Sequence, residues 1–209
     1  MSEGKPFVHV VDDDESFRTA VTRLLHAAGY EVRGYASAGD FLVSRPHDAR
    51  GCLLLDINMP GPSGLDLQAV LADHGIDLPI VFLTGHGDVP ISVRAMKAGA
   101  VDFLTKPVER EALFKAVRDA LARNAEMRET GTRLRELKAR YASLTPRERE
   151  VFAGVVAGKL NKQIAADIGA AERTVKAHRA QVLEKMHVRS LADLVRAATD
   201  LGLRELDTR

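Results

Sequence analysis

The sequence predicts an α/β domain with a parallel sheet over residues 1–122, a helical linker over residues 123–142 and an all-α domain over residues 143–209. Up to residue 122, short apolar runs alternate with amphipathic helical patterns, and regular βα alternation produces a parallel sheet covered by helices. Beyond the linker only helical periodicity remains. Charge divides at nearly the same place, because residues 1–120 carry 12 Lys and Arg against 17 Asp and Glu, whereas residues 121–209 carry 18 against 12. We therefore expect two domains with different partners, and an anionic partner for the second.

Composition points to a cytoplasmic globular protein. The chain has 209 residues, of which 45% are hydrophobic and 28% charged, as expected for a soluble protein of two ordinary domains. Its single cysteine, Cys52, lies inside an apolar run, so no intrachain disulfide can form and the thiol is expected in the core. The N-terminus lacks a signal-like apolar core, and no stretch approaches the length of a membrane span. We expect a cytoplasmic location and no membrane partner.

Five short apolar runs are expected to form the strands of the sheet. They are Phe7–Val11, Glu31–Tyr35, Cys52–Leu55, Leu78–Thr84 and Val101–Leu104. Helices are expected between them: one carrying Phe17, Val21, Leu24 and Leu25 up to Gly29, then Gly39–Ser44, Ser63–Ala72 and Val89–Ala98, and a last one from Glu109 onward. The run Cys52–Leu55 is apolar at every position, which is typical of a strand buried on both faces.

Reactive side chains follow the ends of these strands. Ligands of parallel α/β sheets bind beyond the carboxyl ends of the strands, and these ends are followed by Asp12, Asp13, Asp56, Thr84 and Lys106. Carboxylate oxygens from neighbouring strands suit Mg²⁺. A hydroxyl and an ammonium bind phosphoryl oxygens. The set predicts formation of an aspartyl phosphate beside a divalent ion. The run Asp12–Glu15 also needs a cation or a following helix N-terminus to offset repulsion among its carboxylates.

Four motifs resemble the receiver domain of two-component response regulators of the FixJ type. They are Val10-Val-Asp-Asp-Asp14, Leu55-Asp-Ile-Asn-Met-Pro60, Thr84-Gly-His-Gly-Asp88 and Met96-Lys-Ala-Gly-Ala-Val-Asp-Phe-Leu-Thr-Lys-Pro107. The resemblance covers nearly all of residues 5–122. It implies a flavodoxin-like, five-stranded parallel sheet of order 2-1-3-4-5. It also implies a sensor histidine kinase as partner.

The same resemblance assigns roles to single residues. It implies that Asp56 is the phosphoacceptor and that Mg²⁺ is bound by Asp12, Asp13, Asp56 and the backbone carbonyl of Asn58. Thr84 is then the switch hydroxyl, Lys106 contacts the phosphoryl group, and Phe103 matches the aromatic switch position. For Phe103, a simple core strand residue is an equally natural interpretation. Pro107 would follow a cis peptide bond, and Pro62 departs from the flexible residue that many relatives carry at this position.

The linker permits two interpretations. The helical pattern runs on into Arg123–Arg140, and Gly131 is expected to interrupt the helix midway. Apolar residues recur at spacings of three and four, at Leu134, Leu137, Tyr141 and Leu144. A solvated linker helix and a short dimeric coiled coil both agree with this pattern, since fewer than three heptads are present. In either case the segment is a spacer.

Four helices are expected in the last domain. Thr145-Pro-Arg-Glu148 forms a capping box that starts a helix ended by Gly158. The others are Asn161 to Gly169, Glu172–Met186 and Ser190–Leu201. In the third helix Val175, Val182, Leu183 and Met186 are expected inward, and Lys176, Arg179 and Lys185 outward. A short helix, a tight glycine turn and a basic helix describe a helix-turn-helix, although small helical bundles share the pattern.

This domain resembles the LuxR-type DNA-binding domain over about residues 141–203. The motifs are Leu144-Thr-Pro-Arg-Glu148, Asn161-Lys-Gln-Ile-Ala165, Arg173-Thr-Val-Lys-Ala-His-Arg179 and Leu183-Glu-Lys-Met186. The resemblance implies that the third helix enters the major groove of double-stranded DNA, with Lys176, Ala177, Arg179 and Ala180 nearest the bases or phosphates. Asn161, Lys162 and Thr174 would approach the backbone. Ala171 departs from the frequent Ser or Thr cap, and the small Ala180 suits apolar contact with a thymine methyl.

Together these observations predict a transcription factor rather than an enzyme. A histidine kinase would phosphorylate Asp56, and the phosphorylated protein would dimerise, bind DNA and act on transcription with RNA polymerase. Two rival hypotheses remain. The motif Asp12-x-Asp14 after a strand resembles the nucleophile motif of haloacid-dehalogenase-type phosphatases, with Asp12 as nucleophile. Alternatively, the second domain is a protein-interaction bundle.

Overall fold

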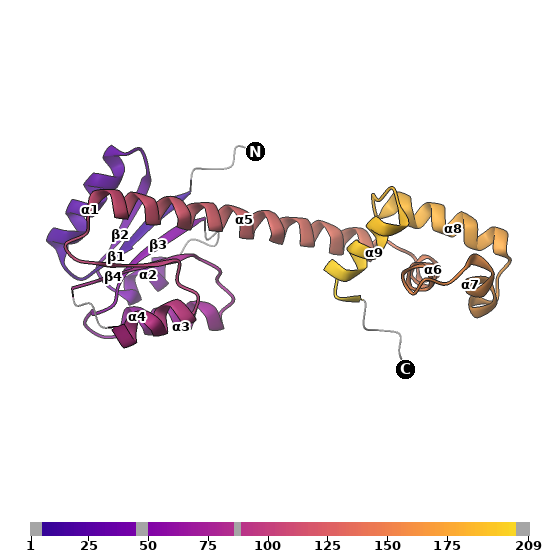
Figure 1. The fold of residues 1–209 in the computed structure, drawn as a ribbon, viewed down its shortest axis with the longest axis horizontal. Coiled ribbons are helices and arrows are strands. Elements are labelled where there is room, and N and C mark those ends of the chain that lie inside the picture. Colours follow the sequence, from indigo (N-terminus) through magenta and orange to yellow (C-terminus); the bar gives the residue numbers. More distant parts are fainter. Residues whose placement is uncertain (1–5, 45–49, 86–88, 204–209) are drawn as a thin grey trace. The chain divides into compact units, whose positions relative to one another are not determined.

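Five parallel strands and the helices between them form the first of two units (Figure 1). The protein is described by a computed structural model of residues 6–44, 50–85 and 89–203. It divides into Met1–Arg128 and Glu129–Arg209. The strands are β1 (Phe7–Val11), β2 (Glu31–Tyr35), β3 (Gly51–Asp56), β4 (Ile80–Thr84) and β5 (Asp102–Thr105). The helices are α1 (Glu15–Ala27), α2 (Ala38–Ser44), α3 (Gly64–Asp73), α4 (Val89–Lys97) and α5 (Arg110–Ala142).

The sheet has the order β2-β1-β3-β4-β5, with every pair parallel, so the predicted fold class is confirmed. β1 and β2 match the predicted ranges, and the other three strands differ from them by one or two residues at their ends. β4 begins at Ile80 rather than Leu78, because Pro79 has no N–H to donate to a neighbouring strand. The winding reverses between β1 and β3, and this is where ligands of such sheets bind.

Alternate residues of each strand pack into two separate cores. Leu53 and Leu55 of β3 face the core that α2, α3 and α4 cover, whereas Cys52 and Leu54 face the core under α1 and α5. Figure 1 shows α1 and α5 on one face of the sheet and α3 and α4 on the other. All six residues of β3 are buried, as predicted for a strand covered on both faces. Burial also raises the pKa of the Cys52 thiol to about 12.

Side-chain caps start the helices that flank the acidic strand ends. Asp14 accepts hydrogen bonds from the backbone N–H groups of Ser16 and Phe17, so one of the four adjacent carboxylates serves as the N-cap of α1. Ser63 and Asp66 form a capping box at the start of α3. Both helices therefore begin at defined places beside the carboxyl edge of the sheet.

Helix α5 is continuous from Arg110 to Ala142, so the predicted interruption at Gly131 is wrong. A glycine inside a helix costs about 1 kcal/mol relative to alanine, which weakens a helix without breaking it. Apolar residues of the linker already pack inside the second unit. Leu137 and Leu144 are buried in the core of the second unit, and Tyr141 packs against that core. A coiled coil built on these positions would have to withdraw them from it.

The second unit adds α6 (Pro146–Val156), α7 (Asn161–Ile168), α8 (Glu172–Lys185) and α9 (Leu191–Asp200), as predicted. Val151, Phe152, Ile164, Val175, Val182, Met186 and Leu194 form its core. The capping box of Thr145 and Glu148 is present, and the Lys185 ammonium donates to both Glu148 carboxylate oxygens at 2.9 and 2.7 Å. The interpretation of Lys185 as an outward, available cation is therefore wrong. Hydrogen bonds from Lys185 and Thr145 lower the pKa of Glu148.

The turn between α7 and α8 has the expected chemistry. Gly169 ends α7 in the left-handed conformation, with φ 64°, which glycine adopts without strain. Ala171 starts α8 without a side-chain cap, so the predicted loss of that hydrogen bond is confirmed. Among the residues that the structure describes, no helix combines the length and apolarity needed to cross a bilayer.

Candidate functional site

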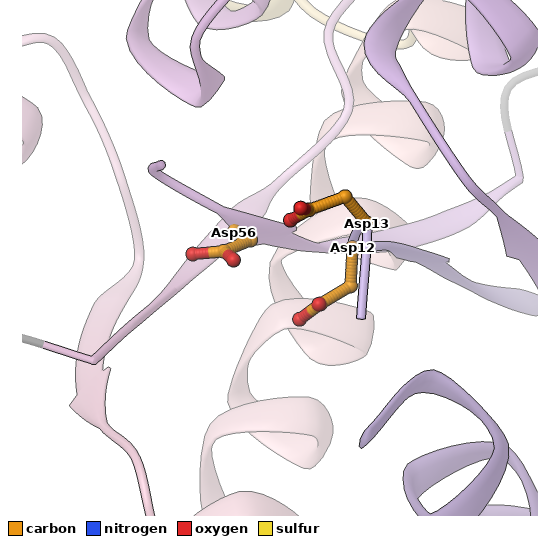
Figure 2. Close-up of side chains that lie close together, drawn as sticks. All are labelled: Asp12, Asp13 and Asp56. Carbon is orange, nitrogen blue, oxygen red and sulfur yellow. The ribbon is translucent and has the colours of Figure 1, made fainter. Parts of the chain in front are cut away.

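Three carboxylates converge at the carboxyl edge of the sheet. Asp12 and Asp13 follow β1 and Asp56 ends β3, and one oxygen from each lies within 4.8 Å of the others (Figure 2). Asp12 is fully buried, Asp56 is 6% exposed and Asp13 is exposed. Three oxygen donors at this spacing, one of them open to solvent, fit a hard divalent cation such as Mg²⁺ or Ca²⁺. The sequence predicted this convergence because neighbouring parallel strands end at one edge.

Lys106 joins two of these carboxylates. Its ammonium donates to Asp12 Oδ2 at 2.6 Å and to Asp56 Oδ2 at 3.0 Å. Burial lowers the pKa of Lys106, but the hydrogen bonds to Asp12 and Asp56 and the negative charges of these carboxylates together outweigh burial, and the pKa is raised. Burial raises the pKa of Asp12 by more than its bond to Lys106 lowers it. The peptide bond between Lys106 and Pro107 is cis, as the receiver resemblance implied.

Backbone contacts hold Asp12 and Asp56 in place. The Asp12 amide donates to the carbonyl of Tyr35 at 3.1 Å, and the Arg18 guanidinium donates to the Asp12 carbonyl at 2.6 Å. The backbone N–H of Asn58 donates to Asp56 Oδ1 at 3.3 Å. A Cβ at Gly64 would lie 2.3 Å from the Asp56 carbonyl oxygen, so α3 can start this close only with glycine. Sequence reasoning missed Arg18, and a basic residue in the first turn of a helix gave no signal of its target.

The two residues predicted to form the switch, Thr84 and Phe103, lie on the two following strands. Thr84 ends β4 and is 1% exposed, and its backbone carbonyl accepts from the Lys106 amide at 2.6 Å. Residue Leu83, immediately before it, is the β4 partner of Asp56. Phe103 on β5 is partly buried and packs against the core under α4. This position agrees with both interpretations of Phe103, as a switch and as a core residue.

The basic helix α8 presents most of the predicted DNA contacts to solvent. Val175 and Val182 are buried on its inner face. The predicted contacts exposed on α8 are Thr174, Lys176, Ala177 and Ala180. Lys162 is exposed on α7. Arg179 is only partly exposed, and its guanidinium donates to Asn161 Oδ1 at 2.6 Å. Arg179 of α8 and Asn161 of α7, predicted as independent DNA contacts, thus bind each other in the structure.

Both units match known families. Residues 8–118 match the family described as "Response regulator receiver domain", and residues 142–198 match "Bacterial regulatory proteins, luxR family". Nodulation protein W of Bradyrhizobium diazoefficiens is 47% identical over 95% of this chain and 88% of its own length. Transcriptional regulatory protein FixJ of Azorhizobium caulinodans is 43% identical over 99% of this chain and 98% of its own length.

Solved structures agree with these matches over most of the chain. The response regulator StyR has a TM-score of 0.83 and 47% identity, with 94% of this chain and 99% of StyR covered. Full-length FixJ from B. japonicum has a TM-score of 0.58 and 39% identity, with 96% of this chain and 99% of that one covered. The chain therefore belongs to the response regulators that join a receiver domain to a LuxR-type DNA-binding domain.

Proposed function

We propose that Asp56 accepts a phosphoryl group from a sensor histidine kinase, and that the phosphorylated protein binds DNA as a homodimer to regulate transcription with RNA polymerase. In this proposal residues 1–122 receive the phosphoryl group, residues 123–142 link the domains and residues 143–209 bind DNA, all in the cytoplasm. One observation carries the proposal: the Lys106 ammonium lies 3.0 Å from Asp56, inside a cluster of three carboxylates. This arrangement combines a carboxylate nucleophile with a cation for phosphoryl oxygens.

The transfer uses groups that are already in place. An Asp56 carboxylate oxygen attacks phosphorus, a new P–O bond forms, and the bond to the donor breaks with its electron pair leaving on the donor. Lys106 then donates to a phosphoryl oxygen, and the Thr84 hydroxyl donates to another. Asp12, Asp13, Asp56 and the Asn58 carbonyl would hold Mg²⁺, which supplies neutralisation of the phosphoryl charge. Asp56 is 6% exposed, so electrophiles other than the bound donor have little access to its carboxylate.

The change in charge must reach the surface for dimerisation to follow. A phosphoryl group adds roughly −1.5 to −2 charge and draws Thr84 and Lys106 toward Asp56. Thr84 ends β4 and Lys106 directly follows β5, on which Phe103 packs against the core under α4. Helix α4 exposes Val89, Val93 and Met96, by 68%, 44% and 44%. Apolar side chains at this spacing share one helix face, which supports a homodimer contact there.

A dimer places two copies of α8 on one DNA duplex. Lys176, Ala177 and Ala180 are exposed for the major groove, while Lys162 and Thr174 are exposed for the DNA backbone. Arg179 and Asn161 form a hydrogen-bonded pair beside them. Tethering makes the second half-site contact effectively intramolecular and strengthens binding by about 100-fold or more.

The test is phosphoryl labelling of three proteins with labelled acetyl phosphate and Mg²⁺. We expect acid-stable but alkali-labile label on the wild type and none on Asp56→Asn, because an amide is a poor nucleophile. Asp73→Asn is the matched control, because Asp73 is an exposed carboxylate at the end of α3. Equal labelling of Asp56→Asn and wild type would contradict the proposal.

Both rival hypotheses give different outcomes. Both Asp12 and Asp56 accept a hydrogen bond from Lys106, but Asp12 is fully buried whereas Asp56 is 6% exposed, so Asp56 is the more accessible nucleophile. Repeated turnover of a phosphate ester that needs Asp12 but not Asp56 would favour the phosphatase. Partner binding that is insensitive to salt, without affinity for any DNA, would favour an interaction bundle.

A further inference from the structure

An aromatic ring lies against the ammonium of Lys106. The Lys106 Nζ atom is 4.2 Å from the centroid of the Phe17 ring. Phe17 lies in the first turn of α1, and its backbone amide donates to Asp14, the N-cap of that helix, at 3.2 Å. Its side chain is partly buried against the core under α1 and α5. The cap and the core therefore fix the position of the ring beside the acidic cluster.

The surroundings of the ammonium leave little room for water. Asp12 and Asp56 accept from it at 2.6 and 3.0 Å, the Phe17 ring covers a further side, and the Lys106 side chain is 18% exposed. The face of an aromatic ring carries partial negative charge and attracts a cation, more strongly where water is excluded. The ring thus stabilises the ammonium in a position from which Lys106 contacts Asp56. Unlike a carboxylate, the ring attracts the ammonium without fixing it through a hydrogen bond.

We propose that Phe17 is a positioning residue for the phosphoryl group, acting through Lys106. The inference rests on the proposed function of Asp56. When a phosphoryl group is bound, Lys106 must exchange part of its contact with Asp12 for phosphoryl oxygens. With the ring in place, the ammonium enters that contact already stripped of water on one side. With an aliphatic side chain, which has no negative ring face, the ammonium loses this attraction and is held less firmly beside the phosphoryl oxygens.

The experiment compares an aliphatic with an aromatic replacement in the full chain. The apparent Kd for beryllofluoride, a phosphoryl mimic, is measured with Mg²⁺ by titrating receiver amide signals in NMR spectra. Phe17→Leu should raise this Kd by about threefold to tenfold, while Phe17→Tyr, which keeps the ring, should stay within about twofold of wild type. Phe114→Leu is the matched control, because Phe114 packs against the same core but lies under Arg110 instead.

A double-mutant cycle separates this role from loss of packing. In a Lys106→Met background the cation is absent, so Phe17→Leu should change the Kd by less than about twofold. The same loss in both backgrounds, an unchanged Kd in Phe17→Leu, or equal losses in Phe17→Leu and Phe17→Tyr would each overturn the proposal. A wild type that neither binds beryllofluoride nor is labelled at Asp56 would overturn the proposed function, and this inference with it.

Discussion

A buried histidine in the first strand predicts a loss of receiver stability in mild acid. His9 on β1 is 1% exposed, its Nδ1 lies 3.1 Å from the Tyr35 hydroxyl, and its ring stacks on Tyr35 and meets Phe41 edge-on. Burial, with a smaller effect of the Arg33 charge, lowers the pKa of His9 from 6.5 to about 4. The neutral ring is therefore the form that the folded receiver holds.

The sign of the effect follows from proton binding. Between pH 6.5 and 4 the unfolded chain binds a proton at His9 and the folded chain does not, so stability is present above the unfolded pKa and is lost as pH falls. This difference between the unfolded and folded pKa of His9 lowers the free energy of unfolding by about 2 kcal/mol between neutral pH and pH 5. Below pH 4 the loss reaches about 3 kcal/mol.

The assay is urea unfolding between pH 7.5 and pH 5, followed through the amide signals of Val8 and Val10, which report the receiver rather than the second unit. The His9→Gln variant keeps a polar partner for Tyr35 and removes the titration. The wild type should lose about 2 kcal/mol more than this variant on acidification to pH 5. Equal pH dependence in the two proteins would refute the assignment of a buried, neutral His9.

Three further predictions concern the second unit and the coupling of the two. Lys176→Ala should weaken binding to every DNA sequence and lower the salt slope by about one unit, measured by fluorescence anisotropy at several salt concentrations; an unchanged affinity and slope would mean that α8 is not the DNA-binding helix. Glu148→Ala should cost the second unit about 2 kcal/mol in thermal unfolding, since it removes both the capping box and the bond to Lys185, while labelling of Asp56 stays normal; an unaltered melting temperature would contradict this. Thr84→Ala should still be labelled by acetyl phosphate but should dimerise less in sedimentation with beryllofluoride, and full dimerisation would exclude its hydroxyl from the switch.

The carboxyl-edge cluster was predictable because it depends on topology alone. Short apolar runs predicted the strands, and parallel strands bring Asp12 and Asp56 to one edge whatever the details of packing. Helix caps were equally readable, since the motif of Thr145 and Glu148 acts over three residues.

Contacts between distant segments were not predictable in the same way. The ring of Phe17 reaches Lys106, Arg179 pairs with Asn161 and Lys185 pairs with Glu148 because of rotamers and of how helices cross neighbouring elements. A helical repeat says which face a residue is on, and not which partner it meets. Gly131 is an error of the opposite kind. The glycine alone predicted a break, but the helical residues on both sides of it keep α5 continuous.

The central claim is that a phosphoryl group on Asp56 controls DNA binding. The direct measurement selects bound fragments from random duplex DNA with the full chain, beryllofluoride and Mg²⁺, and then titrates a selected fragment with and without the mimic. We predict that the mimic strengthens binding by about 100-fold in the wild type and leaves Asp56→Asn unchanged. Equal affinity with and without the mimic in a wild type that has bound it, or the full gain in Asp56→Asn, would contradict the claim.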